Sequence, residues 1–221
     1  FPLANEVAAG SKPWTDMRQL VDMENFVDYM VLNFFTGNYD WDKGNWRAGR
    51  LRGADSPGWW FFSGDSERTL WTLSKNSTGI NFASRASSLH QILARDADYR
   101  LLFADRVHKL LHNDGTLSTV RASEIWNAMA DEVRLPLVAE SARWGDAHRA
   151  SNPYTPDVDW AKESAWMTDI YFKERPAIML DQLRTRNLYP TLEPPTFSQY
   201  GGRIDSGTIL NLSAPQGDIY Y

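Results

Sequence analysis

The sequence predicts an α+β fold: a mainly helical domain that carries one β-hairpin, followed by the first part of a small β module. Three observations lead to this prediction. Apolar residues recur at helical spacing before residue 36 and again after residue 87. Two short strand-like runs between these regions flank a strong turn signal. The composition changes at residues 189–195, where proline becomes frequent.

The composition is typical of a globular domain and excludes several kinds of site. The chain has 221 residues, 43% of them hydrophobic, and a formal net charge of −5. That charge argues against a nucleic-acid partner, because protein surfaces that bind nucleic acid are basic. The absence of cysteine excludes disulfides, zinc–thiolate sites and cysteine nucleophiles. No apolar run reaches the roughly 18 residues that a membrane span needs.

Residues 15–36 are predicted to be helical. Thr15 and Asp22 are candidate N-caps, and Gly37 suits the C-terminal end of a helix. Apolar residues at i, i+4 and i+8 mark its buried face: Phe26, Met30 and Phe34.

A β-hairpin is predicted after the polar turn formed by residues 38–45. Its strands are Asn45–Leu51 and Trp59–Phe62. The connection, Gly53–Gly58, contains Asp55-Ser56-Pro57-Gly58, which is a strong turn signal.

The remainder of the first domain is predicted to be helical from Ser87 onward. A long helix over residues 119–145 is expected to be interrupted near Pro136, because proline removes a helical hydrogen bond. Residues 157–187 are expected to form one or two further helices, with Pro176 near a start.

The predicted domain boundaries follow from the change in composition. Residues 1–189 form the helical domain, 190–196 a stiff Pro-rich linker, and 197–221 a truncated β-sandwich module. The chain begins Phe1-Pro2-Leu3, without the basic and apolar regions of a signal peptide. We therefore expect it to be a piece of a longer protein.

The sharpest chemical signal is Asp40-x4-Asn45. An Asp followed five residues later by an Asn serves phosphoryl transfer in protein kinases, where the Asp orients the substrate hydroxyl and the Asn oxygen holds Mg²⁺. A hairpin would bring a second acidic pair, Asp65 and Glu67, beside Asn45. Alternatives stay open: an Asx-rich turn without chemistry, Asp42 as the working acid, and Glu67 as a surface charge.

Several spaced segments together resemble CotH-type proteins, a family of secreted, spore-coat-like protein kinases. Phe35 to Trp46 resembles their catalytic loop, and Trp60 to Glu67 resembles their apolar strand ending in an acidic metal ligand. Phe103 to Lys109 and Glu140 to Asp146 resemble their C-terminal helices. The resemblance covers about residues 20 to 190. It departs from the family at Gly64, where a Trp is usual.

The resemblance implies the C-lobe of an atypical kinase, acting outside a bacterial cell or at its surface. The intact protein would transfer the γ-phosphoryl of ATP to a protein hydroxyl. Asp40 would be the catalytic acid or base, Asn45 and Asp65 the Mg²⁺ ligands, and Glu67 a further metal carboxylate. The family's nucleotide-gripping lobe would lie upstream of Phe1. We therefore expect that this chain alone does not phosphorylate protein.

The tail, Pro195 to Tyr221, resembles the start of the small β-sandwich that follows chitobiase-type enzymes. This resemblance implies a surface glycan as a possible partner. The alternative function is a non-catalytic, kinase-like module that binds a cell-surface protein or glycan. A third possibility is that Asp40 and Asp65 are a glycosidase acid pair.

Other side chains carry weaker hypotheses. Arg47 is a candidate for binding the phosphates of the nucleotide, as is Arg50, although both equally fit solvated strand positions. His108 and His112 have the i, i+4 spacing that binds metal on a helix, or are polar surface residues. The pair Arg143–Trp144 is either a cation–π stack or a buried packing pair.

Two geometric expectations complete the predictions. The side-chain oxygens of Asp40, Asn45 and Asp65 should lie within about 4–8 Å of one another, because Mg²⁺ binds oxygen near 2 Å and keeps bridging waters. The tail from Phe197 should make few contacts with the helices and should not complete a sheet with the hairpin.

Overall fold

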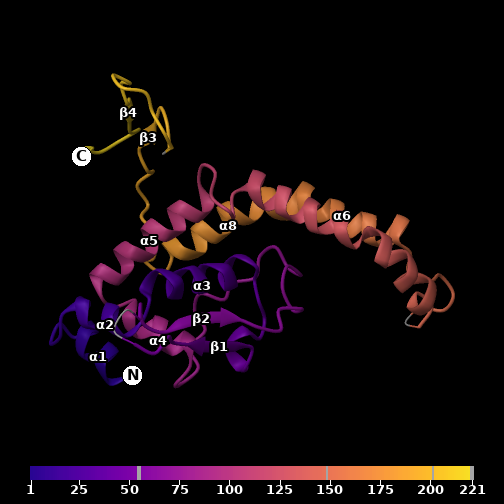
Figure 1. The fold of residues 1–221 in the computed structure, drawn as a ribbon, viewed down its shortest axis with the longest axis horizontal. Helices are drawn as coiled ribbons and strands as arrows, with labels where there is room; N and C mark the ends of the chain where they lie inside the picture. The colour runs from indigo at the N-terminus through magenta and orange to yellow at the C-terminus, as the bar shows by residue number, and fades with distance from the viewer. Residues whose placement is uncertain (54–55, 148, 201, 220–221) are drawn as a thin grey trace.

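The computed structural model describes residues 1–53, 56–147, 149–200 and 202–219. It confirms an α+β architecture that is mainly helical, with two small antiparallel sheets. Helices α1 to α4 lie around the hairpin and α5 packs on the other side of α3, while α6 extends away from them and the C-terminal tail stands apart (Figure 1). The helices are α1 (Pro2–Ala8), α2 (Trp14–Leu20), α3 (Met23–Phe35), α4 (Ala86–Leu93), α5 (Ala97–Leu111), α6 (Thr119–Trp144), α7 (Ala161–Trp166) and α8 (Phe172–Arg184).

The strands are β1 (Trp46–Gly49), β2 (Trp60–Ser63), β3 (Thr196–Phe197) and β4 (Leu212–Ser213). A short 3₁₀ turn, η1 (Trp41–Lys43), precedes β1. Two π-helical turns, η2 (Pro156–Trp160) and η3 (Met167–Tyr171), flank α7, so that the chain is helical without a break from residue 156 to residue 184.

Helix α3 lies at the centre of the core, because it is apolar on nearly every side. Its fully buried residues include Phe26, Met30 and Phe34, as the spacing predicted. Asp22 caps its N-terminus by accepting a hydrogen bond from the Asn25 N–H, and Gly37 follows its end with φ +59°, a conformation that favours glycine.

The predicted single helix over residues 15–36 is instead two helices, α2 and α3. Val21 separates them with extended backbone and forms a parallel bridge with Trp59. The prediction that Thr15 is an N-cap was wrong. Pro13 holds that position, without a side-chain cap, and the helix begins at Trp14.

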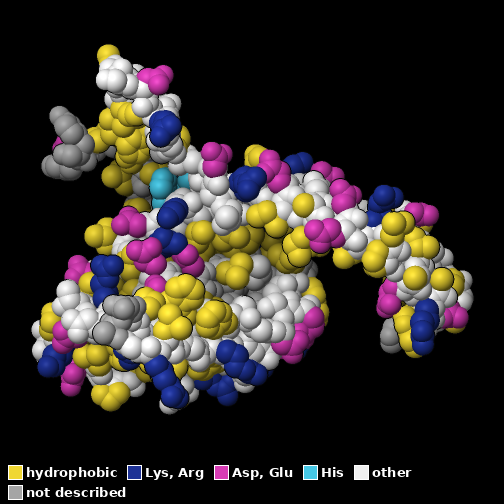
Figure 2. Space-filling model, viewed as in Figure 1, with side chains coloured by type: hydrophobic (Ala, Val, Ile, Leu, Met, Phe, Trp, Pro, Cys, Tyr) yellow, Lys and Arg dark blue, Asp and Glu magenta, His cyan; other side chains and the backbone are white. Residues whose placement is uncertain are grey.

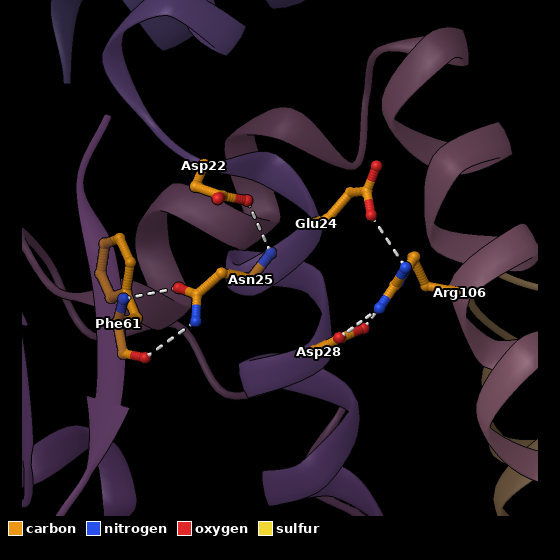
Figure 3. A network of polar contacts seen from close by, with 6 residues as sticks. All are labelled: Asp22, Glu24, Asn25, Asp28, Phe61 and Arg106. Atoms are coloured by element: carbon orange, nitrogen blue, oxygen red, sulfur yellow. Dashed lines mark hydrogen bonds and ion pairs between the residues drawn. The ribbon is translucent and has the colours of Figure 1, made fainter. Parts of the chain in front are cut away.

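The predicted hairpin is confirmed, with Trp46 opposite Ser63 and Gly49 opposite Trp60. Its turn residues 54 and 55, including Asp55, lie outside the described residues. Asn25 of α3 attaches the hairpin to the core (Figure 3). Its Oδ1 accepts the Phe61 N–H at 2.6 Å and its Nδ2 donates to the Phe61 carbonyl at 3.3 Å. The Asn25 amide therefore satisfies both backbone groups of Phe61.

An ion-pair cluster joins α5 to α3 (Figure 3). The Arg106 guanidinium donates to both Asp28 oxygens and, at 2.9 Å, to Glu24. The hydrogen bonds that the guanidinium donates to Asp28 raise the pKa of Arg106. This forked contact fixes the two helices in register beside the hairpin.

The two proline predictions for the later helices were wrong. Helix α6 runs through Pro136 without interruption; Pro136 and Glu132 are both exposed, so water can reach the carbonyl that proline leaves unpaired. Pro176 lies inside a continuous helix, not near a start. It leaves the Phe172 carbonyl without its helical donor, and the Thr119 hydroxyl donates to that carbonyl at 2.9 Å.

The tail packs as weakly as expected. Strands β3 and β4 pair only with each other, and none of the described residues after residue 196 is buried. Within the described residues, no helix combines the length and apolar character needed to cross a membrane.

Candidate functional site

The loop that carries Asp40 begins at the C-terminus of α3. A buried arginine, Arg175, fixes this end of the helix through hydrogen bonds. The Arg175 guanidinium donates to the carbonyls of Phe34, Phe35 and Leu73, the last two at 2.8 Å. The Tyr171 hydroxyl also donates to Phe35, at 2.8 Å. A cation at the end of α3 also complements the partial negative charge of the helix dipole. The start of the loop is therefore fixed from α8, about 140 residues away in sequence.

Asparagine side chains shape the loop itself. Asn38 donates through Nδ2 to the Asn33 side chain at 3.1 Å and accepts the Asp40 N–H at 3.3 Å. Trp41, immediately after Asp40, is fully buried. The Asx-rich turn that the sequence suggested is therefore present, with Asp40 at its surface edge.

Asp42 has a structural contact that explains its presence. It is buried, and its carboxylate accepts hydrogen bonds from the Ser87 N–H, at 3.1 Å, and from the Ser87 hydroxyl. Ser87 is the second residue of α4, so Asp42 caps that helix from a distance. Burial raises the pKa of Asp42, while its bonds with Ser87 oppose that shift. The carboxylate is engaged with α4 and is not free to act on a substrate.

The segment after β2 lies beside the Asp40 loop, and three backbone hydrogen bonds fix this arrangement. The Gly64 N–H donates to the Asn45 carbonyl at 2.9 Å. The Tyr39 N–H donates to the Arg68 carbonyl at 3.1 Å, and the Leu70 N–H donates to the Thr36 carbonyl at 2.7 Å. Asp65 and Glu67 lie between the first two of these bonds, opposite Asp40.

The acidic side chains, on two adjacent loop segments, interact electrostatically. A hydrogen bond with Asp65 raises the pKa of Glu67, and the charges of Asp65 and Asp40 act in the same direction. The Arg68 guanidinium lies 3.6 Å from Asp40 Oδ2. Asp40 Oδ1 is buried and has no hydrogen-bond partner in the structure. An unpaired carboxylate oxygen beside further carboxylates fits a position where a cation or a donor binds.

The acidic residues do not form a closed protein cage for a metal. Within the described residues, no three His, Cys, Asp or Glu side chains gather closely enough to hold an ion by themselves. Mg²⁺ does not require such a cage, because it keeps waters and uses one or two carboxylates together with phosphates. The predicted 4–8 Å separations among Asp40, Asn45 and Asp65 stay a prediction.

The two candidate phosphate-binding arginines make local contacts. Arg47 Nη1 donates to the carbonyls of Gly44 and Trp46, both at 2.8 Å. Arg50 Nε donates to the Ser56 hydroxyl at 3.1 Å. Arg47 is exposed next to Asn45, so its proposed contact with a nucleotide would compete with these carbonyl bonds.

A cluster of aromatic and basic side chains beside Asp40 was missed by the sequence reasoning. Arg68 lies over the Trp71 ring at 5.4 Å, Lys75 over the Tyr39 ring at 4.1 Å, and the two rings are 5.6 Å apart. Trp71 is 57% exposed. No periodic pattern relates these residues, because they lie in loops, and their proximity comes from the backbone pairing of Tyr39 with Arg68.

The other sequence hypotheses resolve differently. The Arg143 guanidinium lies 4.9 Å from the Trp144 ring centre, and Trp144 is 52% exposed, so this pair is a surface cation–π stack and not a buried packing pair. His108 and His112 do face each other, with ring centres 4.6 Å apart.

Comparison with known proteins adds no relative: no family model, no curated protein and no solved structure matches this chain.

Proposed function

We propose that this chain carries the metal-binding part of a phosphoryl-transfer site, used by an atypical secreted protein kinase on protein hydroxyls. The observation that supports the proposal is the backbone pairing of the Asp40 loop with the segment after β2, which sets Asp65 and Glu67 opposite Asp40. Asp40 Oδ1 is buried without a hydrogen-bond partner, which favours the binding of a cation or a donor at that oxygen. The resemblance to CotH-type proteins names the same residues.

The proposed roles follow from the position of each residue. Asp65 and Asn45, on adjoining ends of the hairpin, would hold Mg²⁺, which would bridge and neutralise the ATP phosphates. Asp40, paired with Arg68, would orient the acceptor hydroxyl. Glu67 would complete the metal site through water. In such sites catalysis consists mainly of positioning and charge neutralisation.

Calorimetric titration of the chain with ATP and Mg²⁺ tests the metal site. We expect weak binding that Asp65→Asn abolishes and that the matched control Glu163→Gln, on exposed α7, leaves unchanged. A chain extended upstream by a nucleotide-gripping lobe should bind tightly and transfer radiolabelled phosphate to protein, because effective positioning supplies several kcal/mol of the barrier. Asp65→Ala should abolish that transfer. Robust transfer by the 221-residue chain alone would contradict the two-lobe requirement.

A second candidate is a non-catalytic module that binds a cell-surface protein or glycan. The supporting observation is a group of exposed aromatic side chains, since Trp60 and Phe62 lie on the outer face of the hairpin and are 42% and 48% exposed. Exposed aromatic faces suit sugar rings or protein partners. Absence of nucleotide binding in both the short and the extended chain would favour this candidate.

A further inference from the structure

Two histidines and a tyrosine meet where α5 ends. His108 lies in the last turn of α5, His112 is its C-cap residue, and their rings stack. The Tyr189 hydroxyl lies 3.4 Å from His108 Nδ1 and 3.2 Å from His112 Nε2. One oxygen and two ring nitrogens, drawn from two distant segments, therefore converge on a single point. Figure 2 shows histidine side chains at the surface between the helices and the tail.

The surroundings favour unprotonated imidazoles at neutral pH. Partial burial lowers the pKa of His108, although the charge of Asp105 opposes this shift. Burial also lowers the pKa of His112, where Glu193 opposes the shift and Arg184 adds to it. A neutral imidazole offers a nitrogen lone pair, which is the form that binds a metal ion.

We propose that His108 Nδ1, His112 Nε2 and the Tyr189 hydroxyl form a binding site for a divalent transition-metal ion such as Zn²⁺. Two histidines one helical turn apart present their nitrogens on one face. The Tyr189 hydroxyl now lies between the two nitrogens, so an ion bound at about 2.0–2.1 Å from each nitrogen requires the hydroxyl to move aside by about one zinc–oxygen bond length, roughly 2 Å. Nitrogen and oxygen ligands suit Zn²⁺ better than Mg²⁺.

The site would couple metal binding to the position of the C-terminal segment. Tyr189 is buried and follows α8, and the Arg184 guanidinium lies over its ring at 5.8 Å. Arg184 also forms an ion pair with Glu193 at 3.3 Å. An ion shared by α5 and Tyr189 would fasten the start of the linker to the helical domain, independently of the Asp40 site.

The test is a Zn²⁺ titration of the tag-free 221-residue chain by calorimetry at pH 7.5, together with Co²⁺ titration followed by visible absorption. We expect saturable binding of one ion and a Co²⁺ spectrum typical of nitrogen and oxygen ligands. His112→Ala should weaken Zn²⁺ binding by about 10- to 100-fold or more, since even outer residues of metal sites contribute that much. Tyr189→Phe, which keeps the ring, should weaken it to a smaller extent.

Lys109→Ala, on the exposed side of the same helical turn, is the matched control and should bind Zn²⁺ as the parent chain does. Circular dichroism of each variant in EDTA checks that it folds. Absence of saturable binding would overturn the proposal. Tyr189 would then be linked to His108 and His112 by hydrogen bonds only. Equal loss of affinity in His112→Ala and Lys109→Ala would overturn it too. Full affinity in Tyr189→Phe would overturn the assignment of the hydroxyl as a ligand.

Discussion

Arg175 is the side chain on which the Asp40 loop depends most. It is fully buried, burial lowers its pKa, and its donors serve the carbonyls of Phe34, Phe35 and Leu73. The Leu73 carbonyl has Arg175 as its donor, while the Phe34 carbonyl also accepts the Gly37 N–H at 3.3 Å and the Phe35 carbonyl also accepts the Tyr171 hydroxyl at 2.8 Å. A buried acceptor that loses its donor retains the full cost of leaving water.

Replacing Arg175 with leucine should therefore lower the free energy of unfolding by about 2–3 kcal/mol, because the Leu73 carbonyl loses its donor and the Phe34 and Phe35 carbonyls each lose one of two. Chemical denaturation followed by tryptophan fluorescence measures the change. Arg121→Leu, which breaks an exposed pair with Glu124 on α6, is the control and should cost under about 1 kcal/mol. Similar losses in the two variants would contradict the assigned role.

The buried side chain of His90 makes the free energy of unfolding depend on pH. The side chain is fully buried, with Nδ1 2.7 Å from the Tyr99 hydroxyl and Nε2 unpaired. Burial lowers the pKa of His90 to about 3. Because the folded pKa lies below the unfolded one, the unfolded chain binds the proton first, and stability falls as the pH drops from about 6.5 toward 3.

The His90 contribution should amount to roughly 1.4 kcal/mol of unfolding free energy per pH unit below 6.5. The measurement compares the parent chain with His90→Phe at pH 7.5 and pH 5. The parent should lose about 2 kcal/mol more than the variant over this interval. His108 and His112 remain in both proteins, so their own lowered pKa values cancel in the comparison. If the difference in unfolding free energy between the parent and His90→Phe were the same at pH 7.5 and pH 5, the role assigned to His90 would be refuted.

The sequence predicted features that depend on neighbouring residues, such as helix ends. It did not predict the roles of side chains whose partners lie far away in the sequence. Asp22 and Gly37 were identified as helix ends because capping depends on residues only a few positions away. Asp42 could not be interpreted, since the helix that it caps begins about 45 residues later. Arg175 gave no signal for the same reason: a buried arginine with carbonyl partners is defined only by tertiary contacts.

At the level of elements, the hairpin was predictable and its attachment was not. Its strands and turn follow from local sequence, but the contact of Asn25 with Phe61 bridges 36 residues. The helices containing Pro136 and Pro176 show the converse. Local rules predicted an interruption at Pro136 and a helix start near Pro176, whereas the helical backbone continues and water or Thr119 compensates for the missing hydrogen bonds.

Asn25→Ala should loosen the hairpin from α3. It removes an acceptor for the Phe61 N–H and a donor for its carbonyl, which should cost about 1–3 kcal/mol of unfolding free energy. Hydrogen exchange read by NMR should show lost protection at the Phe61 amide, with α5 amides little changed. The control, Asn127→Ala, lies on the exposed face of α6. Retained protection at Phe61 would mean that pairing with β1 and the bridge between Val21 and Trp59 hold β2 in place without Asn25.

At the scale of the whole molecule, the candidate site joins segments that only the complete helical domain holds together. Arg175 of α8 fixes the start of the Asp40 loop, α4 engages Asp42, and the hairpin brings Gly64 to Asn45. Motif and resemblance in the sequence proposed Asp40, Asn45, Asp65 and Glu67 as the site residues. It could not identify the basic and aromatic neighbours in the loop after β2, because no regular period orders that loop.

The tail offers a test of whether the chain contains one cooperative unit or more. Its strands β3 and β4 pair over two residues each, and none of its described residues is buried. A two-stranded ladder without a core is marginal in water, so the tail should contribute almost nothing to the stability of the helices. Leu188 and Tyr189, which are buried against the helices, belong to the helical domain by the same reasoning.

Truncation after Pro195 should therefore leave the free energy of unfolding within about 0.5 kcal/mol of that of the full chain, as for surface changes away from the core. Truncation after Arg186 should instead cost several kcal/mol, because it also removes the buried side chains of Leu188 and Tyr189. Chemical denaturation of the three chains measures both changes. A large loss on truncation after Pro195 would mean that the tail packs on the helices in solution, and the boundary near residue 190 would then be wrong.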